Sequence, residues 1–188
     1  MGRLNYVAIM SADGYIADND GNFDWAEPDA EVHAFVNDLD RQNGTHLYGR
    51  RTYEIMQVWQ TLPTGPDEPA EIRDYATLWR AIDKVVFSTS LAAVTTPRTQ
   101  LMREFDLDFV RNLKATATQD ISIGGPTLAA SAIRPGLIDD YHFFQHPILI
   151  GGGLRALPDS PRIGLELVSE RRFAGGVVYT HYRSAGSD

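Results

Sequence analysis

The stretch ISIGGPTLAASAI, from Ile121 to Ile133, changes from one type of secondary structure to another at a pair of glycines. Its apolar start predicts a buried strand over 121–123. Pro126 suits the first turn of a helix, and the small and apolar residues after it predict a helix over 126–133. Because glycine has no side chain, Gly124 and Gly125 let another group approach the backbone. The junction is therefore either a ligand site or a place of close strand–helix packing.

Strands alternate with helices outward from this junction. The predicted strands cover residues 4–10, 45–49, 84–88, 121–123, 137–150 with a break near Pro147, and a terminal hairpin of 166–173 and 176–183. The predicted helices cover residues 29–40 with Asp29 as N-cap, 50–59, 70–81, 107–115 and 126–133. This order predicts an α/β fold with a central, mostly parallel sheet, helices on both faces and an antiparallel edge. We expect one domain over residues 1–184 and a short flexible tail over 185–188.

The composition restricts the possible functions. The chain has 188 residues, 43% of them hydrophobic and 22% charged, which is typical of a globular protein. A net charge of −8 disfavours nucleic acid as a partner. No apolar run is long enough for a membrane helix and no signal peptide is recognised, so we expect a cytoplasmic protein. Cysteine is absent and the histidines have no recognised metal spacing, so no metal site is predicted.

Two other strand ends carry unusual residues. In LYGRRTYE, Gly49 ends a strand and is followed by Arg50, Arg51 and Thr52 at a helix start, which suits an anion or else an ordinary turn with solvated arginines. The strand VVF is followed by three hydroxyl residues, which could donate to a phosphate or ribose or simply cap a turn: Ser88, Thr89 and Ser90. Ligands of open α/β sheets bind beyond the carboxyl ends of the strands, and the two helix starts, after Gly49 and after Gly125, together favour a pyrophosphate.

Four stretches in this order resemble the dihydrofolate reductase superfamily, and most closely its branch typified by the reductase domain of riboflavin biosynthesis: SADGYIA, YGRRTYE, DKVVFSTSL and IGGPTLAASAIRPGLIDDYHFFQHPILIGGG. Together they span roughly residues 4 to 155. The resemblance implies a dihydrofolate-reductase-like three-layer fold with a mixed, mostly parallel sheet of about eight strands. It also implies NADPH as the cofactor. For the apolar segment FFQHPILIGGG, it implies a homodimer.

The resemblance also assigns residues to parts of the cofactor. Gly49, Arg50 and Thr52 would line its adenosine-phosphate side, and Ser88, Thr89 and Ser90 would lie near the 2′-phosphate and ribose. The pyrophosphate and nicotinamide ribose would be held by Gly124, Gly125, Thr127 and Leu128, and the backbone of Ala8 would face the nicotinamide. The dinucleotide would thus pass against the glycine pair. An unusual peptide bond, the cis form included, is implied between Gly124 and Gly125.

The implied reaction is hydride transfer from NADPH to a C=N-type bond of a small heterocycle, as in a 5-amino-6-(5-phosphoribosylamino)uracil reductase. Asp13 in SADG matches the acidic position of that branch and is our candidate proton donor, although Asp-Gly also suits a turn. Folate reductases carry their acid early on the first helix, where Asp29 and Glu31 lie here in a context that does not match. Unlike the fused bifunctional riboflavin enzymes, these 188 residues are expected to contain no deaminase domain with zinc ligands. Dihydrofolate reduction and a non-catalytic NADP(H)-binding sensor remain alternatives.

Overall fold

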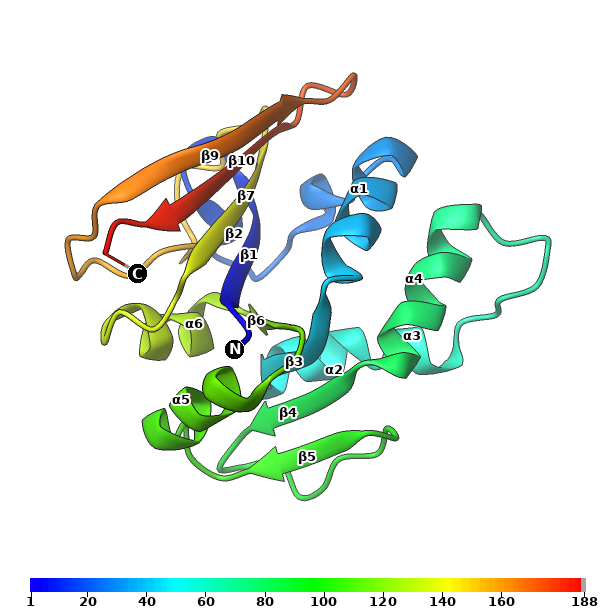
Figure 1. Ribbon diagram of the computed structural model, residues 1–188. Helices are drawn as coiled ribbons and strands as arrows, with labels where there is room; N and C mark the ends of the chain where they lie inside the picture. The colour runs from blue at the N-terminus through cyan, green and yellow to red at the C-terminus, as the bar shows by residue number, and fades with distance from the viewer. Residues whose placement is uncertain (187–188) are drawn as a thin grey trace.

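A computed structural model describes residues 1–186 as an eight-stranded sheet with helices on both faces (Figure 1). The strand order is β5-β4-β3-β6-β1-β7-β10-β9, and a second sheet pairs β2 with β8. The strands are β1 (Leu4–Ser11), β2 (Tyr15–Ala17), β3 (Asn43–Gly49), β4 (Asp83–Phe87), β5 (Thr99–Met102), β6 (Asp120–Gly124), β7 (Asp140–His146), β8 (Leu154–Arg155), β9 (Leu165–Arg172) and β10 (Val178–Ser184). The predicted fold class is confirmed.

In the eight-stranded sheet, the six strands β5, β4, β3, β6, β1 and β7 run parallel, while β10 runs antiparallel to both β7 and β9. In Figure 1 the antiparallel hairpin, coloured orange and red, forms one edge of the sheet, and β5 forms the other. Since parallel strands point the same way, the carboxyl ends of β5, β4, β3, β6, β1 and β7 lie along one edge of the sheet. The three junctions singled out in the sequence follow β4, β3 and β6, which are neighbours.

The helices form two layers. They are α1 (Ala30–Asp40), α2 (Arg50–Met56), α3 (Val58–Thr61), α4 (Ala70–Ala81), α5 (Leu107–Thr116) and α6 (Pro126–Ile133), with a short 3₁₀ helix η1 at Asp24–Ala26. Side chains of α5 and α6 pack on one face of the sheet around Leu47 and Ile123. Side chains of α1 pack around Phe144, and those of α4 around Tyr48, on the opposite face. None of the helices in residues 1–186 has the length and apolar character needed to cross a bilayer.

Most predicted boundaries agree with the structure within a few residues, and Asp29 caps α1 by accepting a hydrogen bond from Val32 N at 2.9 Å. The predicted helix over 50–59 is divided into α2 and α3. The sequence reading missed β5, a four-residue edge strand, and the two-residue strand β8. Residues 187–188 of the predicted tail lie outside the described residues, whereas Ala185 N donates to Gly164 O at 2.9 Å.

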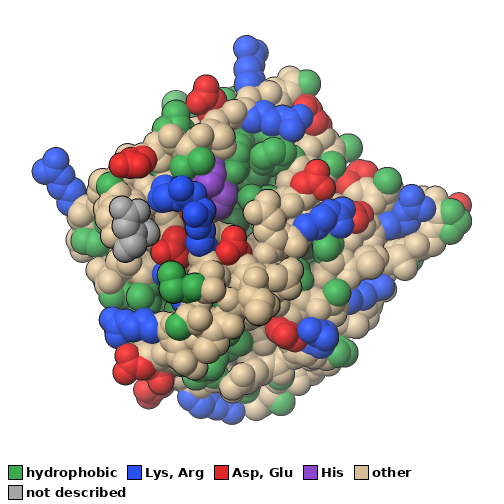
Figure 2. All heavy atoms as spheres, viewed as in Figure 1, with side chains coloured by type: hydrophobic (Ala, Val, Ile, Leu, Met, Phe, Trp, Pro, Cys, Tyr) green, Lys and Arg blue, Asp and Glu red, His purple; other side chains and the backbone are tan. Residues whose placement is uncertain are grey.

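The surface charge is mixed. Figure 2 shows acidic and basic side chains interspersed on the face that carries the β9–β10 hairpin and α1, with hydrophobic side chains and a histidine visible between them. All eight residues of β9 are exposed. In the segment expected to form a dimer interface, Phe143 and Phe144 are buried in the chain's own core, while Ile148 and Leu149 are exposed. The homodimer stays a prediction.

Candidate functional site

The predicted cofactor residues lie at neighbouring strand ends. Gly49 ends β3, Ser88 directly follows β4, and Gly124 ends β6, and these three strands are adjacent in the order β4-β3-β6, with β1 next. With about 4.8 Å between strands, the distance from β4 to β1 is about 14 Å. An elongated ligand could therefore contact all of these junctions at once.

The glycine pair makes room for side chains of the protein itself. A Cβ atom at Gly125 would collide with Thr52 Oγ1, and one at Gly124 would lie 3.2 Å from Tyr48 Cε1. The turn after β6 thus packs directly on the end of β3 and the start of α2. This is the packing alternative considered for the sequence, and it explains both glycines without a ligand. Whether a dinucleotide also passes here stays a prediction.

The backbone at this turn corrects one expectation. Within residues 1–186 the cis peptide bond is at Ser160–Pro161, so the cis form implied for Gly124–Gly125 is wrong. Instead, Gly125 has φ +88° and ψ 129°, a conformation that L-residues with a side chain rarely adopt. A glycine in this conformation turns the chain from β6 into α6 without a cis bond.

The start of α6 has free hydrogen-bond donors. Among the described residues, no side chain caps this helix, and Pro126 occupies its first turn. Because the first N–H groups of a helix have no partner within it, those of Thr127 and Leu128 are available to an acceptor beyond the sheet edge. Thr127 is exposed and Leu128 half-buried, so the turn is open to solvent.

The turn after β3 presents positive charge. Arg50 and Arg51 are both exposed, and the contact of Arg50 with Glu54 is long, at 3.8 Å. An exposed pair at this distance contributes little to stability, so the Arg50 guanidinium can exchange this partner for a ligand. Gly49 brings this turn against α6: a Cβ there would lie 3.8 Å from Leu128 Cβ, which is ordinary contact.

Residues 88–92, which we call the hydroxyl loop, carry both buried and exposed hydroxyl residues. Ser88 is buried, and its Oγ accepts hydrogen bonds from Ser90 N at 3.3 Å and Leu91 N at 3.0 Å. Ser88 therefore shapes the loop. Thr89 and Ser90 are exposed, so their hydroxyls are the ones that could contact a ligand.

The nicotinamide position proposed for Ala8 lies where β1 loses a neighbour. β1 pairs with β6 only as far as Tyr6 and Ile123, but it continues beside β7 as far as Ser11 and His146. From Val7 onward, the side of β1 that faces β6 has no strand partner within residues 1–186. Ala8 is 2% exposed and its methyl group packs in the core, so a contact between its backbone and a ligand stays a prediction.

Asp13 joins the end of β1 to the glycine-rich loop after β7. Its carboxylate accepts hydrogen bonds from Ser11 Oγ at 2.6 Å, Gly151 N at 2.8 Å and Ile150 N at 3.2 Å. The bond from Ser11, aided by those two backbone groups, holds the pKa of Asp13 below its usual value. Asp13 is exposed, and in the free protein it is a carboxylate that organises a loop. Its role as a proton donor stays a prediction.

The two acidic residues weighed for the folate reductase position are engaged elsewhere. Asp29 caps α1, and Glu31 accepts from Arg171 Nη2 at 2.8 Å and from Ala174 N at 3.2 Å. Both hold α1 to its surroundings, in agreement with their poor match to the folate reductase position.

Two buried ring nitrogens near the end of β7 were not predicted from the sequence. Trp25 Nε1 and His146 Nε2 are buried without a hydrogen-bond partner in the described residues, and the two rings meet edge to face at 6.0 Å. Burial lowers the pKa of His146, so its imidazole is neutral at pH 7. The alternation of His142, Phe144 and His146 on one face of β7 gave no signal that distinguishes this residue from a core histidine.

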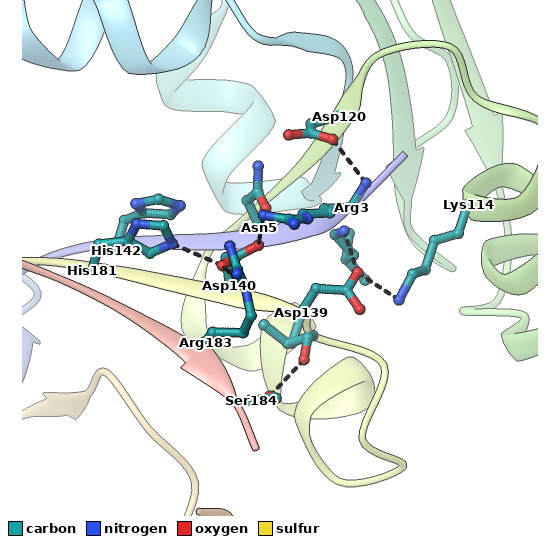
Figure 3. Close-up of polar contacts among 12 residues, drawn as sticks. Arg3, Asn5, Lys114, Asp120, Asp139, Asp140, His142, His181, Arg183 and Ser184 are labelled. Atoms are coloured by element: carbon teal, nitrogen blue, oxygen red, sulfur yellow. Dashed lines mark hydrogen bonds and ion pairs between the residues drawn. The ribbon is translucent and has the colours of Figure 1, made fainter. Parts of the chain in front are cut away.

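A polar cluster lies at the opposite, amino-terminal end of the parallel strands (Figure 3). Buried Asp140 accepts from Arg183 Nε at 3.2 Å and Arg3 Nη1 at 3.4 Å, and its Oδ1 lies 2.7 Å from His181 Nε2. These contacts hold the pKa of Asp140 below its usual value against the effect of its burial. The cluster joins β1, β7 and β10 and is remote from the carboxyl edge, so it belongs to the framework of the fold.

The fold and the arrangement of this edge define a dihydrofolate-reductase-like α/β protein. The chain belongs to the RibD C-terminal domain family, whose profile matches residues 3–179. It is 30% identical over 192 residues to an uncharacterised protein of Bacillus subtilis (strain 168), YyaP, covering 98% of this chain and 96% of that protein.

Solved structures agree on the fold. A "Putative riboflavin biosynthesis protein" from Shewanella sp. PV-4 superposes with a TM-score of 0.75 at 21% identity, covering 97% of this chain and 99% of the other. Dihydrofolate reductase from Enterococcus faecalis, solved with NADP(H), superposes with a TM-score of 0.66 at 17% identity, covering 100% and 98%. The resemblance inferred from the sequence is confirmed at the level of family and fold.

Proposed function

We propose that the protein is an NADPH-dependent reductase of a small heterocyclic substrate, of the phosphoribosylaminopyrimidine type used in riboflavin synthesis. The observation that carries this proposal is the unpaired side of β1 from Val7 onward, next to the uncapped start of α6. The edge of β1 without a strand partner thus lies beside helix N–H groups without a capping side chain. The membership of the family and the fold shared with a dihydrofolate reductase solved with NADP(H) support the choice of cofactor.

The residues at the edge fit the successive parts of such a cofactor. Arg50 with the exposed hydroxyls of Thr89 and Ser90 would hold the phosphate of the adenosine end, because a dianion needs fixed charge and several donors. The N–H groups of Thr127 and Leu128 would donate to the pyrophosphate. Thr52 would act mainly by packing on Gly125 and so fixing the turn.

Bound NADPH would supply the hydride, while the protein positions the reactants. The backbone of Ala8 would lie beside the nicotinamide, and Asp13 would lie on the substrate side at the end of β1. A lowered pKa keeps Asp13 deprotonated at neutral pH, so in the free protein it has no proton to donate. It could donate a proton only if bound substrate displaces its loop contacts or desolvates it, either of which would raise its pKa.

The lowered pKa of Asp13 is also compatible with a second function. A protein that binds NADP(H) through the same edge but lacks a competent proton donor would act as a sensor of the cofactor, without turnover. The anchoring of the 150–151 loop by Asp13 is the observation that favours this alternative.

One set of measurements separates these functions. NADPH oxidation is followed at pH 7 with the phosphoribosylaminopyrimidine and, separately, with dihydrofolate, and NADPH binding is titrated without substrate. We expect NADPH binding and turnover of the aminopyrimidine. Turnover of dihydrofolate alone would identify a folate reductase, and binding without turnover of either substrate would identify the sensor. Absence of NADPH binding would reject the proposed cofactor.

A further inference from the structure

Arg103 clamps the hydroxyl loop. It directly follows β5, and β5 pairs with β4 in register from Lys84 and Thr99 to Phe87 and Met102. The guanidinium therefore lies beside the residues that follow β4. Its Nη1 donates to Leu91 O at 2.5 Å and more weakly to Ser88 O at 3.4 Å, and its Nη2 donates to Ala92 O at 3.4 Å.

These bonds complete a structure that Ser88 begins. The Ser88 hydroxyl satisfies the N–H groups of Ser90 and Leu91 from inside the loop, and Ser88 N donates to Met102 O at 2.9 Å. Arg103 satisfies carbonyls of the same loop from outside. The backbone on either side of Thr89 and Ser90 is thus held while both side chains stay exposed.

The charge of Arg103 is not neutralised by an ion pair. No carboxylate among residues 1–186 lies within 4.0 Å of its guanidinium, and its bonds all go to neutral carbonyls. By contrast, Arg98, at the other end of β5, pairs with Asp83 at 2.9 Å. A guanidinium held by carbonyls keeps its full positive charge next to the loop, in a chain whose net charge is −8.

We propose that Arg103 is a positioning residue for the phosphate end of the cofactor: it fixes the hydroxyl loop so that Thr89 and Ser90 can bind the 2′-phosphate that distinguishes NADPH from NADH. This inference rests on the proposed function. It assigns part of the cofactor preference to a residue outside the motifs that carry the family resemblance.

The test compares Arg103→Ala and Arg103→Lys with Arg98→Ala, which removes the same charge from the other end of the same strand. Dissociation constants are measured for NADPH and NADH, and backbone amide exchange is measured for residues 88–92. Arg103→Ala should speed amide exchange in the loop and weaken NADPH binding by about 10-fold or more, with a smaller loss of NADH binding. Lysine keeps the positive charge, but its compact ammonium group cannot hold several carbonyls at once. The NADPH affinity and the loop exchange rate of Arg103→Lys should therefore lie between those of the unmodified protein and those of Arg103→Ala.

Arg98→Ala should leave both affinities and loop exchange unchanged. Full recovery of NADPH binding in Arg103→Lys would show that charge alone matters and would overturn the positioning role. Unchanged loop exchange in Arg103→Ala would overturn it as well. If the unmodified protein binds neither dinucleotide, the proposed function itself fails. A different outcome would reject only the role of Arg103. In that case the unmodified protein binds NADPH, and the Arg103→Ala variant binds it equally well.

Discussion

The imidazole rings of His142 and His181 are stacked, with centroids 4.3 Å apart and planes inclined by 22°. His142 is 4% exposed, and its Nδ1 lies 2.7 Å from the Tyr179 hydroxyl. Burial, assisted by the neighbouring His181 and opposed by Asp140, lowers the pKa of His142 to about 4. The folded protein thus holds this ring neutral at a pH where the unfolded chain would protonate it.

This difference predicts acid sensitivity. Because the unfolded chain binds more protons between pH 6.5 and about 4, the free energy of unfolding should fall as the pH decreases through that range. At about 1.4 kcal/mol for each pH unit, the loss would be about 3 kcal/mol. His142→Gln should remove this contribution to the slope in urea unfolding curves recorded across the range, whereas that of His146, whose pKa burial also lowers, should remain. His33→Gln, outside the cluster, should keep the slope. An unaltered slope in His142→Gln would contradict the assignment.

Gly125→Ala should destabilise the protein by about 1–3 kcal/mol because alanine is strained at φ +88° and its Cβ would meet Thr52 Oγ1. Thr52→Ala in the same chain should recover the part due to the collision and leave the backbone strain. Gly49→Ala is the matched control, since φ is −78° there and the added Cβ makes ordinary contact. Thermal unfolding of the three variants and the unmodified protein tests this, and equal losses at Gly49 and Gly125 would be incompatible with it.

Arg50→Ala should weaken NADPH binding by about 10–150-fold, the equivalent of one charge-assisted hydrogen bond, and leave NADH binding nearly unchanged. Arg51→Ala removes the adjacent exposed arginine and should have little effect, because two neighbouring side chains at a helix start diverge. Fluorescence titration gives the dissociation constant of each cofactor from each of the two variants. An equal loss of NADPH and NADH binding in Arg50→Ala would instead place this residue at the pyrophosphate.

Asp13→Asn tests the two roles of Asp13 separately. If Asp13 donates a proton to substrate, turnover should fall by about 10²–10⁴-fold with NADPH affinity little changed. Because an amide accepts fewer hydrogen bonds than a carboxylate, we also expect faster amide exchange at Ile150 and Gly151. Faster exchange with unchanged turnover would leave Asp13 an anchor of the loop and would remove it from the reaction.

The sequence was sufficient for elements whose pattern is local. The helix at 29–40 was predictable because Val32, Phe35, Val36 and Leu39 recur at helical spacing behind a capping aspartate. β5 was missed because its short sequence, TQLM, is partly exposed at a sheet edge and lacks a run of buried residues. The resemblance to a known family supplied the cofactor assignment, which periodicity alone could not give.

Features that depend on distant contacts were not predictable. The glycine pair was correctly seen as a place of close approach, but the approaching groups are Tyr48 and Thr52, some seventy residues earlier. The loop clamp by Arg103 likewise becomes visible only when β5 is known to lie beside β4. Spacing along the chain carries no information on which strands become neighbours.

The central place of β1 in the sheet has a consequence for how the chain folds. β1 ends at Ser11, yet its neighbours β6 and β7 begin only at Asp120 and Asp140. Closing such a long loop is entropically costly, and sheets built on distant pairings form slowly. During synthesis on the ribosome, this apolar strand would therefore leave the exit tunnel well before either partner. Until then LNYVAIMS is a segment prone to aggregate, and a chaperone that shields it should raise the yield of folded protein.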